Sequence, residues 1–115
     1  MNISHADTNF KQYKEYIYIN DLSNGDSREI LNQNRFNYVR IIQFGVYDFT
    51  SHFTLNFTRT NEKINILPSS SIDHTHKFKI EKNELLTITY KNYSKIKTNI
   101  NSLVLELGWD QSLTL

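Results

Sequence analysis

The feature that most restricts the fold of this chain is the alternation of apolar and polar side chains between Ser51 and Thr60. Phe53, Leu55 and Phe57 occupy every second position, and the residues between them are polar. Side chains two apart share one face of a strand, whereas a helix would spread these three around its surface. The segment therefore predicts a half-buried β-strand.

Six further segments carry related patterns, and we expect each of them to form a strand: Tyr13–Ile19, Phe36–Tyr47, Lys63–Leu67, Thr75–Lys82, Leu85–Lys91 and Ser102–Trp109. Within Phe36–Tyr47 the pattern predicts a central strand with Gly45 as a candidate bulge. One face carries Val39 and Ile41, and the other carries Tyr38, Ile42, Phe44 and Val46. In Ser102–Trp109, every second residue from Leu103 is apolar, which predicts a strand with one buried face.

The connections are predicted from turn residues. Asn83-Glu84 lies between two alternating segments and predicts a hairpin, with Phe78 and Ile80 buried on its first strand. Pro68 closes the preceding strand, because proline has no amide proton to donate. Asn20–Asn37 reads as a long polar connection with a turn at Asn24-Gly25 and, over Ser27–Leu31, at most one or two helical turns.

Composition supports an all-β fold, because Thr, Ile and Val supply 26 of the 115 residues and alanine occurs once, as Ala6. A chain of this length has room for one domain. We therefore predict a single antiparallel β-sandwich of six to seven strands, jelly-roll or Ig-like, over residues 13–115. Residues 1–12 are polar and without period, and are predicted to form an N-terminal arm.

Several classes of function are disfavoured by what the chain lacks. It has no cysteine, so disulfides, thiolate catalysis, iron–sulfur ligation and cysteine zinc sites are excluded. Three glycines cannot build a glycine-rich phosphate loop. No run approaches the ~18 apolar residues of a membrane span, and the first ten residues do not resemble a secretion signal. The net charge of +1 selects no partner.

His74-x-His76 is the strongest local candidate for metal binding, because residues two apart on a strand project from one face. His52 and Asp73 could complete such a site only if the fold brought them close. The pair also fits an ordinary surface position at the start of a strand. We therefore expect no metal.

Catalytic groups are not evident in the sequence. Ser69–Ser71, one of the two histidines and Asp73 could in principle form a hydrolase triad, but the glycines that surround a nucleophilic serine are missing. The carboxylates that could act in pairs fall in turns or at outward positions, where we expect them to be solvated: Asp48, Asp73, Glu81, Glu84 and Glu106. We therefore expect no enzymatic activity and no cofactor.

A basic region is the most plausible binding feature. Lys77, Lys79, Lys82, Lys91, Lys95 and Lys97 face only Glu81 and Glu84, and Tyr90 and Tyr93 lie among them. Lysines beside stacking aromatics suit single-stranded nucleic acid. Outward lysines on an amphipathic strand are also an ordinary solvated face that prevents edge pairing. The binding residues named by this hypothesis are Lys77, Lys79, Lys91, Tyr93, Lys95 and Lys97.

Saccharide binding is a third class, because seven tyrosines and one tryptophan could supply platforms for sugar rings. Most of these rings are needed for the core. Trp109 ends an alternating strand and is expected to plug the core or to cover its rim.

A resemblance in style is carried by the segments Phe53–Phe57, Ile64–Ser71, Phe78–Ile80 and Leu86–Tyr90. Residues 36–109, which contain them, resemble the small β-sandwich proteins that bacteriophages place on capsids, collars and tails. The resemblance implies a location in the virion, or in the host cytoplasm before assembly. It carries over no functional residue.

We therefore expect a non-enzymatic assembly component that binds other protein subunits, including copies of itself. Met1–Phe10 and Asp110–Leu115 are the predicted contact segments. The alternatives are a carbohydrate- or receptor-binding module, and a small intracellular inhibitor or single-stranded nucleic-acid binder that uses the basic region.

Overall fold

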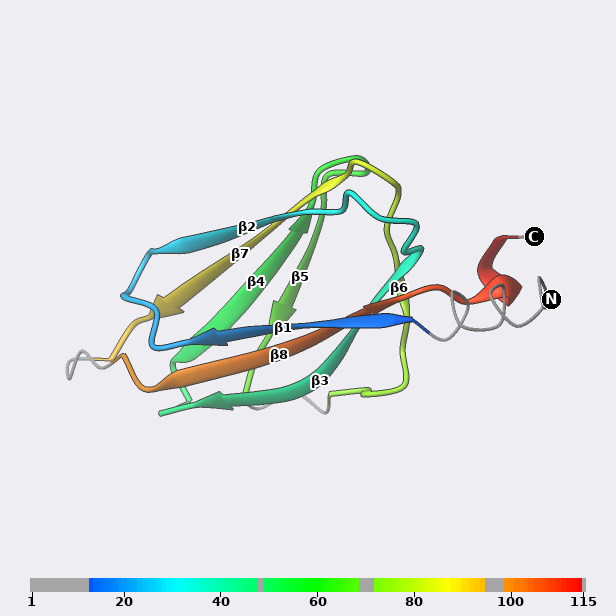
Figure 1. Cartoon of the computed structure of the whole chain (residues 1–115). Coiled ribbons are helices and arrows are strands. Elements are labelled where there is room, and N and C mark those ends of the chain that lie inside the picture. Colours follow the sequence, from blue (N-terminus) through cyan, green and yellow to red (C-terminus); the bar gives the residue numbers. More distant parts are fainter. Residues whose placement is uncertain (1–12, 48, 69–71, 95–98, 115) are drawn as a thin grey trace, which may run out of the picture.

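The computed structural model describes residues 13–47, 49–68, 72–94 and 99–114, and shows two sheets packed face to face (Figure 1). The predicted arm, residues 1–12, lies outside the described part. The strands are β1 (Lys14–Asn20), β2 (Ser27–Leu31), β3 (Tyr38–Val46), β4 (Ser51–Phe57), β5 (Glu62–Ile66), β6 (Phe78–Lys79), β7 (Leu85–Asn92) and β8 (Asn101–Gly108). The predicted all-β sandwich is confirmed, with eight strands among the described residues instead of six or seven.

Sheet A has the strand order β1-β8-β3-β6, and sheet B has the order β2-β7-β4-β5, with antiparallel neighbours throughout. Only β4 and β5 are consecutive strands of one sheet; every other connection crosses between the sheets. This eight-stranded arrangement is a jelly roll. An Ig-like sandwich is excluded, because its first two strands share a sheet.

The interior is formed by the alternating residues that the sequence indicated. Phe53, Leu55 and Phe57 of β4 are at most 1% exposed, and Leu103, Leu105 and Leu107 of β8 are at most 2% exposed. Each strand therefore turns one face inward, as period-2 patterning requires. Trp109 follows β8 and is half-buried.

A bulge in β3 changes one predicted face. The register of β3 against β8 shifts between Ile41 and Gln43, so the extra residue is Ile42, and the prediction of a bulge at Gly45 is wrong. The bulge reverses the alternation, because one inserted residue flips every following side chain to the other face. Val39 and Ile41 before it, and Phe44 and Val46 after it, therefore all pack against the core.

Ser27–Leu31 is strand β2, so the prediction of helical turns there is wrong. β2 is an edge strand of sheet B, and Ile30 is its one half-buried residue, opposite Leu86. With so few inward apolar residues, the strand carries almost no alternation to detect. The preceding turn at Asn24-Gly25 is confirmed, with Gly25 at φ 88°.

The predicted hairpin around Asn83-Glu84 is also wrong. Instead of running over Thr75–Lys82, the first strand is β6, only two residues long, and it pairs with β3 in sheet A, whereas β7 lies in sheet B. The turn exists, with Asn83 at φ 66°, but it joins the two sheets. Ile80 is buried as expected, at 3% exposed, whereas Phe78 is only half-buried and packs against the core.

Figure 1 shows Gln111–Thr114 at one end of the sandwich, and the end of β7 and the start of β8 at the opposite end. The chain ends in a four-residue 3₁₀ turn, Gln111–Thr114. Among the described residues, no helix has the length and apolar character needed to cross a membrane.

Candidate functional site

The two candidate metal ligands, His74 and His76, have separate partners. His74 Nδ1 lies 3.0 Å from the carbonyl oxygen of Ile41, at the β3 bulge, and the His76 ring meets the Phe78 ring edge-on at 4.4 Å. Residues 74–75 form a turn and not a strand, so strand geometry does not place the two histidines on one face. No cluster of three or more possible metal ligands occurs in the part of the chain that the structure describes.

Asp73 stabilises the same turn. Its carboxylate accepts hydrogen bonds from the backbone N–H and the hydroxyl of Thr75, and these bonds lower its pKa. Ser69–Ser71, the predicted nucleophile region, and Asp48, a predicted solvated carboxylate, lie outside the described residues.

The predicted basic region is divided between the two sheets. Lys79 belongs to β6 in sheet A, and Lys77 beside it pairs with Asp110 at 2.8 Å while its ammonium lies 4.7 Å from the Tyr38 ring centre. Lys91 belongs to β7 in sheet B. Lys95 and Lys97 lie outside the described residues. The described lysines therefore do not follow a single strand or sheet.

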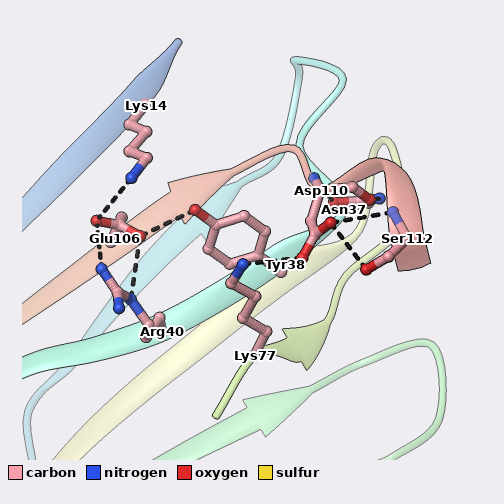
Figure 2. A network of polar contacts seen from close by, with 8 residues as sticks. All are labelled: Lys14, Asn37, Tyr38, Arg40, Lys77, Glu106, Asp110 and Ser112. Atoms are coloured by element: carbon pink, nitrogen blue, oxygen red, sulfur yellow. Dashed lines mark hydrogen bonds and ion pairs between the residues drawn. The ribbon is translucent and has the colours of Figure 1, made fainter. Parts of the chain in front are cut away.

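Glu106 was expected to be solvated, and that expectation is wrong, because it is 1% exposed. Its carboxylate accepts hydrogen bonds from Arg40 Nε at 3.1 Å and Nη2 at 3.0 Å, and from the Tyr38 hydroxyl at 2.9 Å (Figure 2). The Tyr16 hydroxyl donates at 3.1 Å, and Lys14 Nζ lies at 3.8 Å. The network joins β1, β8 and β3 across the outer face of sheet A.

The network holds its members in fixed protonation states. Burial alone would raise the pKa of Glu106, but hydrogen bonds from Arg40, Tyr38 and Tyr16 outweigh it and lower that pKa. Burial and the bond to Glu106 raise the pKa of Tyr38. Near neutral pH the carboxylate is therefore ionised and the phenol neutral. This is a structural arrangement and not one poised to transfer a proton.

Gly108 makes the network possible. A Cβ at this position would lie 2.3 Å from the Tyr38 hydroxyl and 2.6 Å from the adjacent ring carbon. The absence of a side chain lets the Tyr38 ring lie over β8 and reach Glu106.

A second group of contacts fastens the end of the chain beside this network (Figure 2). Asp110 binds Lys77, and its backbone exchanges two hydrogen bonds with the Asn37 side chain, at 2.8 and 2.9 Å. The Asp110 carboxylate also accepts from the Ser112 N–H and hydroxyl. The bonds from Lys77 and Ser112 lower the pKa of Asp110 to about 2.

Glu84 was also expected to be solvated and is 6% exposed. Its carboxylate accepts hydrogen bonds from the backbone N–H groups of Glu81 at 2.9 Å and Arg59 at 3.0 Å. Glu81 itself is an exposed partner of Arg59 at 3.5 Å. Both buried glutamates therefore act within the fold.

Two of the predicted binding residues, Lys91 and Tyr93, do lie together. They line a shallow depression of about 370 Å³ on the outer face of sheet B, with His52 and several threonine and asparagine side chains. The Tyr93 ring stacks on the His52 ring at 5.9 Å and 20°. Burial and the nearby charge of Lys91 lower the pKa of His52.

An apolar surface that the sequence patterns do not predict lies at the end of the sandwich opposite Gln111–Thr114. Tyr47 and Phe49 follow β3, and Ile100 precedes β8; they are 54%, 83% and 62% exposed. Val46 pairs with Asn101, which places Tyr47 beside Ile100. We name these three residues the loop-end patch. Its only sequence signal is apolar residues within turn segments.

No family model, curated protein or solved structure matches this chain. The geometry of these surfaces is therefore the basis for proposing a function.

Proposed function

We propose that this chain is a non-enzymatic assembly component, a small bacteriophage virion protein, that binds another protein subunit through the loop-end patch. The observation that carries the proposal is the exposure of Tyr47, Phe49 and Ile100 on adjoining connections at one end of the sandwich. The partner we commit to is a second copy of this chain.

Proximity distinguishes these residues from ordinary exposed apolar side chains, because the register places Tyr47 beside Ile100 and Phe49 follows Tyr47 by two positions. Scattered exposed apolar residues are normal, whereas contiguous groups mark interaction sites. Two of the other exposed aromatics have partners within the chain: Tyr13 stacks on Phe36, and Tyr16 binds Glu106. Aromatic residues are enriched at the centres of protein interfaces.

A second copy is favoured because every copy carries the same patch. A two-fold axis through it would pair Phe49 and its neighbours with their own equivalents, which is the commonest way in which identical chains associate.

The assignment to a virion rests on the resemblance of residues 36–109 to phage sandwich proteins, and on the use of jelly rolls in viral capsids. The latter is analogy at the level of fold. A non-enzymatic role is supported by the two buried glutamates, because Glu106 and Glu84 are both engaged by groups of the chain itself.

Asp110–Leu115, the C-terminal contact segment predicted from sequence, stays a prediction. Its first residue, Asp110, is bound to Asn37 and Lys77 of its own sandwich, so the contact proposed here is at the loop-end patch. Met1–Phe10, the other predicted segment, lies outside the described residues.

Sedimentation velocity over a range of protein concentrations tests the proposal. We expect the chain to associate as concentration rises, and Phe49→Ser to shift the association to higher concentration. Leu31→Ser is the matched control, because Leu31 is 49% exposed but lies at the far end of β2. A chain that remains monomeric throughout, or equal effects of the two variants, would contradict self-contact through the loop-end patch.

A further inference from the structure

The outer face of sheet B carries mainly threonine and asparagine side chains, and not the charged side chains that usually cover a solvated face. On the central strand β4, the outward residues are His52, Thr54 and Asn56, opposite Lys91, Thr89 and Thr87 of β7. On the other side, β5 places Asn65 opposite Thr54 and Lys63 opposite Asn56. Short hydroxyl and amide side chains therefore form the floor, and charged residues occur only at its margins.

The floor is recessed and partly shielded from water. Thr54, Asn56, Thr87 and Thr89 are half-buried, and with their neighbours they line the depression. Part of their hydrogen-bonding capacity is used internally, since the Thr54 hydroxyl donates to Asn65 at 2.9 Å and the Thr89 hydroxyl shares a hydrogen bond with Ser27 at 2.8 Å. The side-chain oxygen of Asn56 is buried without a hydrogen-bond partner in the described structure. The amide groups of Asn56 and Asn65 and the hydroxyl of Thr87, which line the depression, supply further hydrogen-bonding groups for a ligand that carries many hydroxyls.

Two lysines bring positive charge to the depression, and Glu29 of β2 lies opposite Thr87 at its margin. Lys63 and Lys91 line it, and no carboxylate does. Neither lysine forms an ion pair with the residues that the structure describes. They lie at opposite corners of the grid, four residues apart along β4, which is roughly 13 Å in the strand direction.

An aromatic surface completes the site. Tyr93 is 69% exposed, and its ring is supported from one side by His52. A supported and exposed ring beside polar hydrogen-bonding groups suits the apolar face of a sugar ring.

We propose that the outer face of sheet B binds an acidic saccharide. The sugar ring lies against Tyr93, its hydroxyls bond to the threonine and asparagine floor, and its acid groups lie near Lys91 and Lys63. This site is separate from the loop-end patch, and neither proposal depends on the other.

Single-stranded nucleic acid is the competing occupant. It requires a series of stacking rings along a strongly basic groove. This depression offers one stacked pair and two lysines, and its floor is made of hydroxyls and amides. The chemistry therefore favours the saccharide.

Titration by amide-detected NMR tests the proposal directly. The acidic probes are a hyaluronan tetrasaccharide, sialyllactose and a heparin tetrasaccharide, which distinguish carboxylate from sulfate groups. The comparison ligands are neutral chitotetraose and a single-stranded oligothymidylate. We expect at least one acidic probe to shift the amide signals of β4 and β7 at Thr54, Asn56, Thr87 and Thr89.

Two variants and one control assign the contacts. Lys91→Gln should weaken binding of the acidic probe about tenfold, through loss of a charge-assisted hydrogen bond. Tyr93→Ala should weaken it roughly fivefold. Lys79→Gln removes an exposed lysine from sheet A and should have no effect. Thermal melts of each variant check that the fold is retained.

Three results would overturn the proposal: no binding of any acidic probe, equal weakening by Lys79→Gln, or tighter binding of oligothymidylate through the same residues. Phe49→Ser should leave saccharide binding unchanged, so failure of one proposal can be told from failure of the other.

Discussion

At the scale of single residues, the most consequential feature is a carboxylate placed where water does not reach it. Glu106 has 2% of its side chain exposed, whereas its main partner, Arg40, keeps 27%. A buried charge is tolerated only when partners replace the lost hydration. The two members of the pair should therefore respond differently to replacement.

We predict that Arg40→Ala destabilises the protein more than Glu106→Gln does. The first leaves a buried carboxylate with fewer donors and should cost about 3 kcal/mol. The second leaves a guanidinium that can reach water, so its cost should be smaller. Chemical denaturation of both variants measures this order. A larger effect of Glu106→Gln would show that the carboxylate is better hydrated than its surroundings indicate.

Gly108→Ala should destabilise the protein by roughly 1–3 kcal/mol, the usual cost of overpacking. The added Cβ would lie 2.3 Å from the Tyr38 hydroxyl and displace the ring from Glu106. In a Tyr38→Ala background the same substitution should cost much less. A double-mutant cycle over the two positions measures this coupling, and additive effects would refute the steric explanation.

At the scale of elements, the connection between the sheets depends on a buried side chain that belongs to no strand. Asn32, 1% exposed, follows β2 and donates to the carbonyl oxygens of Phe36 at 3.0 Å and Glu81 at 2.9 Å. The backbone carbonyl oxygen of Asn32 accepts from Asn83 N–H at 2.6 Å. One residue thus joins the end of β2, the approach to β3 and the turn between β6 and β7.

We predict that Asn32→Ala costs about 2 kcal/mol, because two carbonyl groups lose their donor. Asn34→Ala is the control, since Asn34 is exposed and its one hydrogen bond, to Glu15, is long at 3.5 Å. Thermal denaturation of both variants makes the comparison. Similar losses in the two would show that the Asn32 side chain does not join these segments.

At the scale of the whole molecule, the shifted pKa values reduce the stability of the fold both in acid and in alkali. The pKa values of Glu106, Asp73, Asp110 and His52 are all lowered in the folded chain. Those of Tyr38 and Tyr16 are raised. Glu106, Tyr38 and Tyr16 belong to one hydrogen-bonded network, so their effects on stability are coupled, whereas those of Asp73 and His52, which lie elsewhere, should add.

We predict a stability maximum between pH ~6.5 and ~10, the unperturbed values of histidine and tyrosine. Below this range the unfolded chain binds more protons than the folded one, so stability falls as pH falls, first through His52 and then through the carboxylates. The loss continues to the Asp110 pKa of about 2. Above pH ~10 the unfolded tyrosines ionise first, so stability falls again.

Denaturant melts across this pH range measure the profile. Glu106→Gln should reduce the loss of stability below pH ~4.5, and Tyr38→Phe should reduce the loss of stability above pH ~10. An acid limb that is unchanged by Glu106→Gln would contradict the assignment of its lowered pKa.

Sequence by itself determined which segments are strands and which of their faces are buried wherever alternation is strong, as in β4 and β8. That information is local, because side chains two apart on a strand share a face whatever the strand pairs with. Tertiary structure alone decided that β6 and β7 belong to different sheets, that Ile42 reverses the faces of β3, and that Glu106 is buried. It also brought Lys91 together with His52 and Tyr47 with Ile100. These outcomes depend on contacts between distant parts of the chain, such as Arg40 with Glu106, 66 positions apart, which no local period encodes.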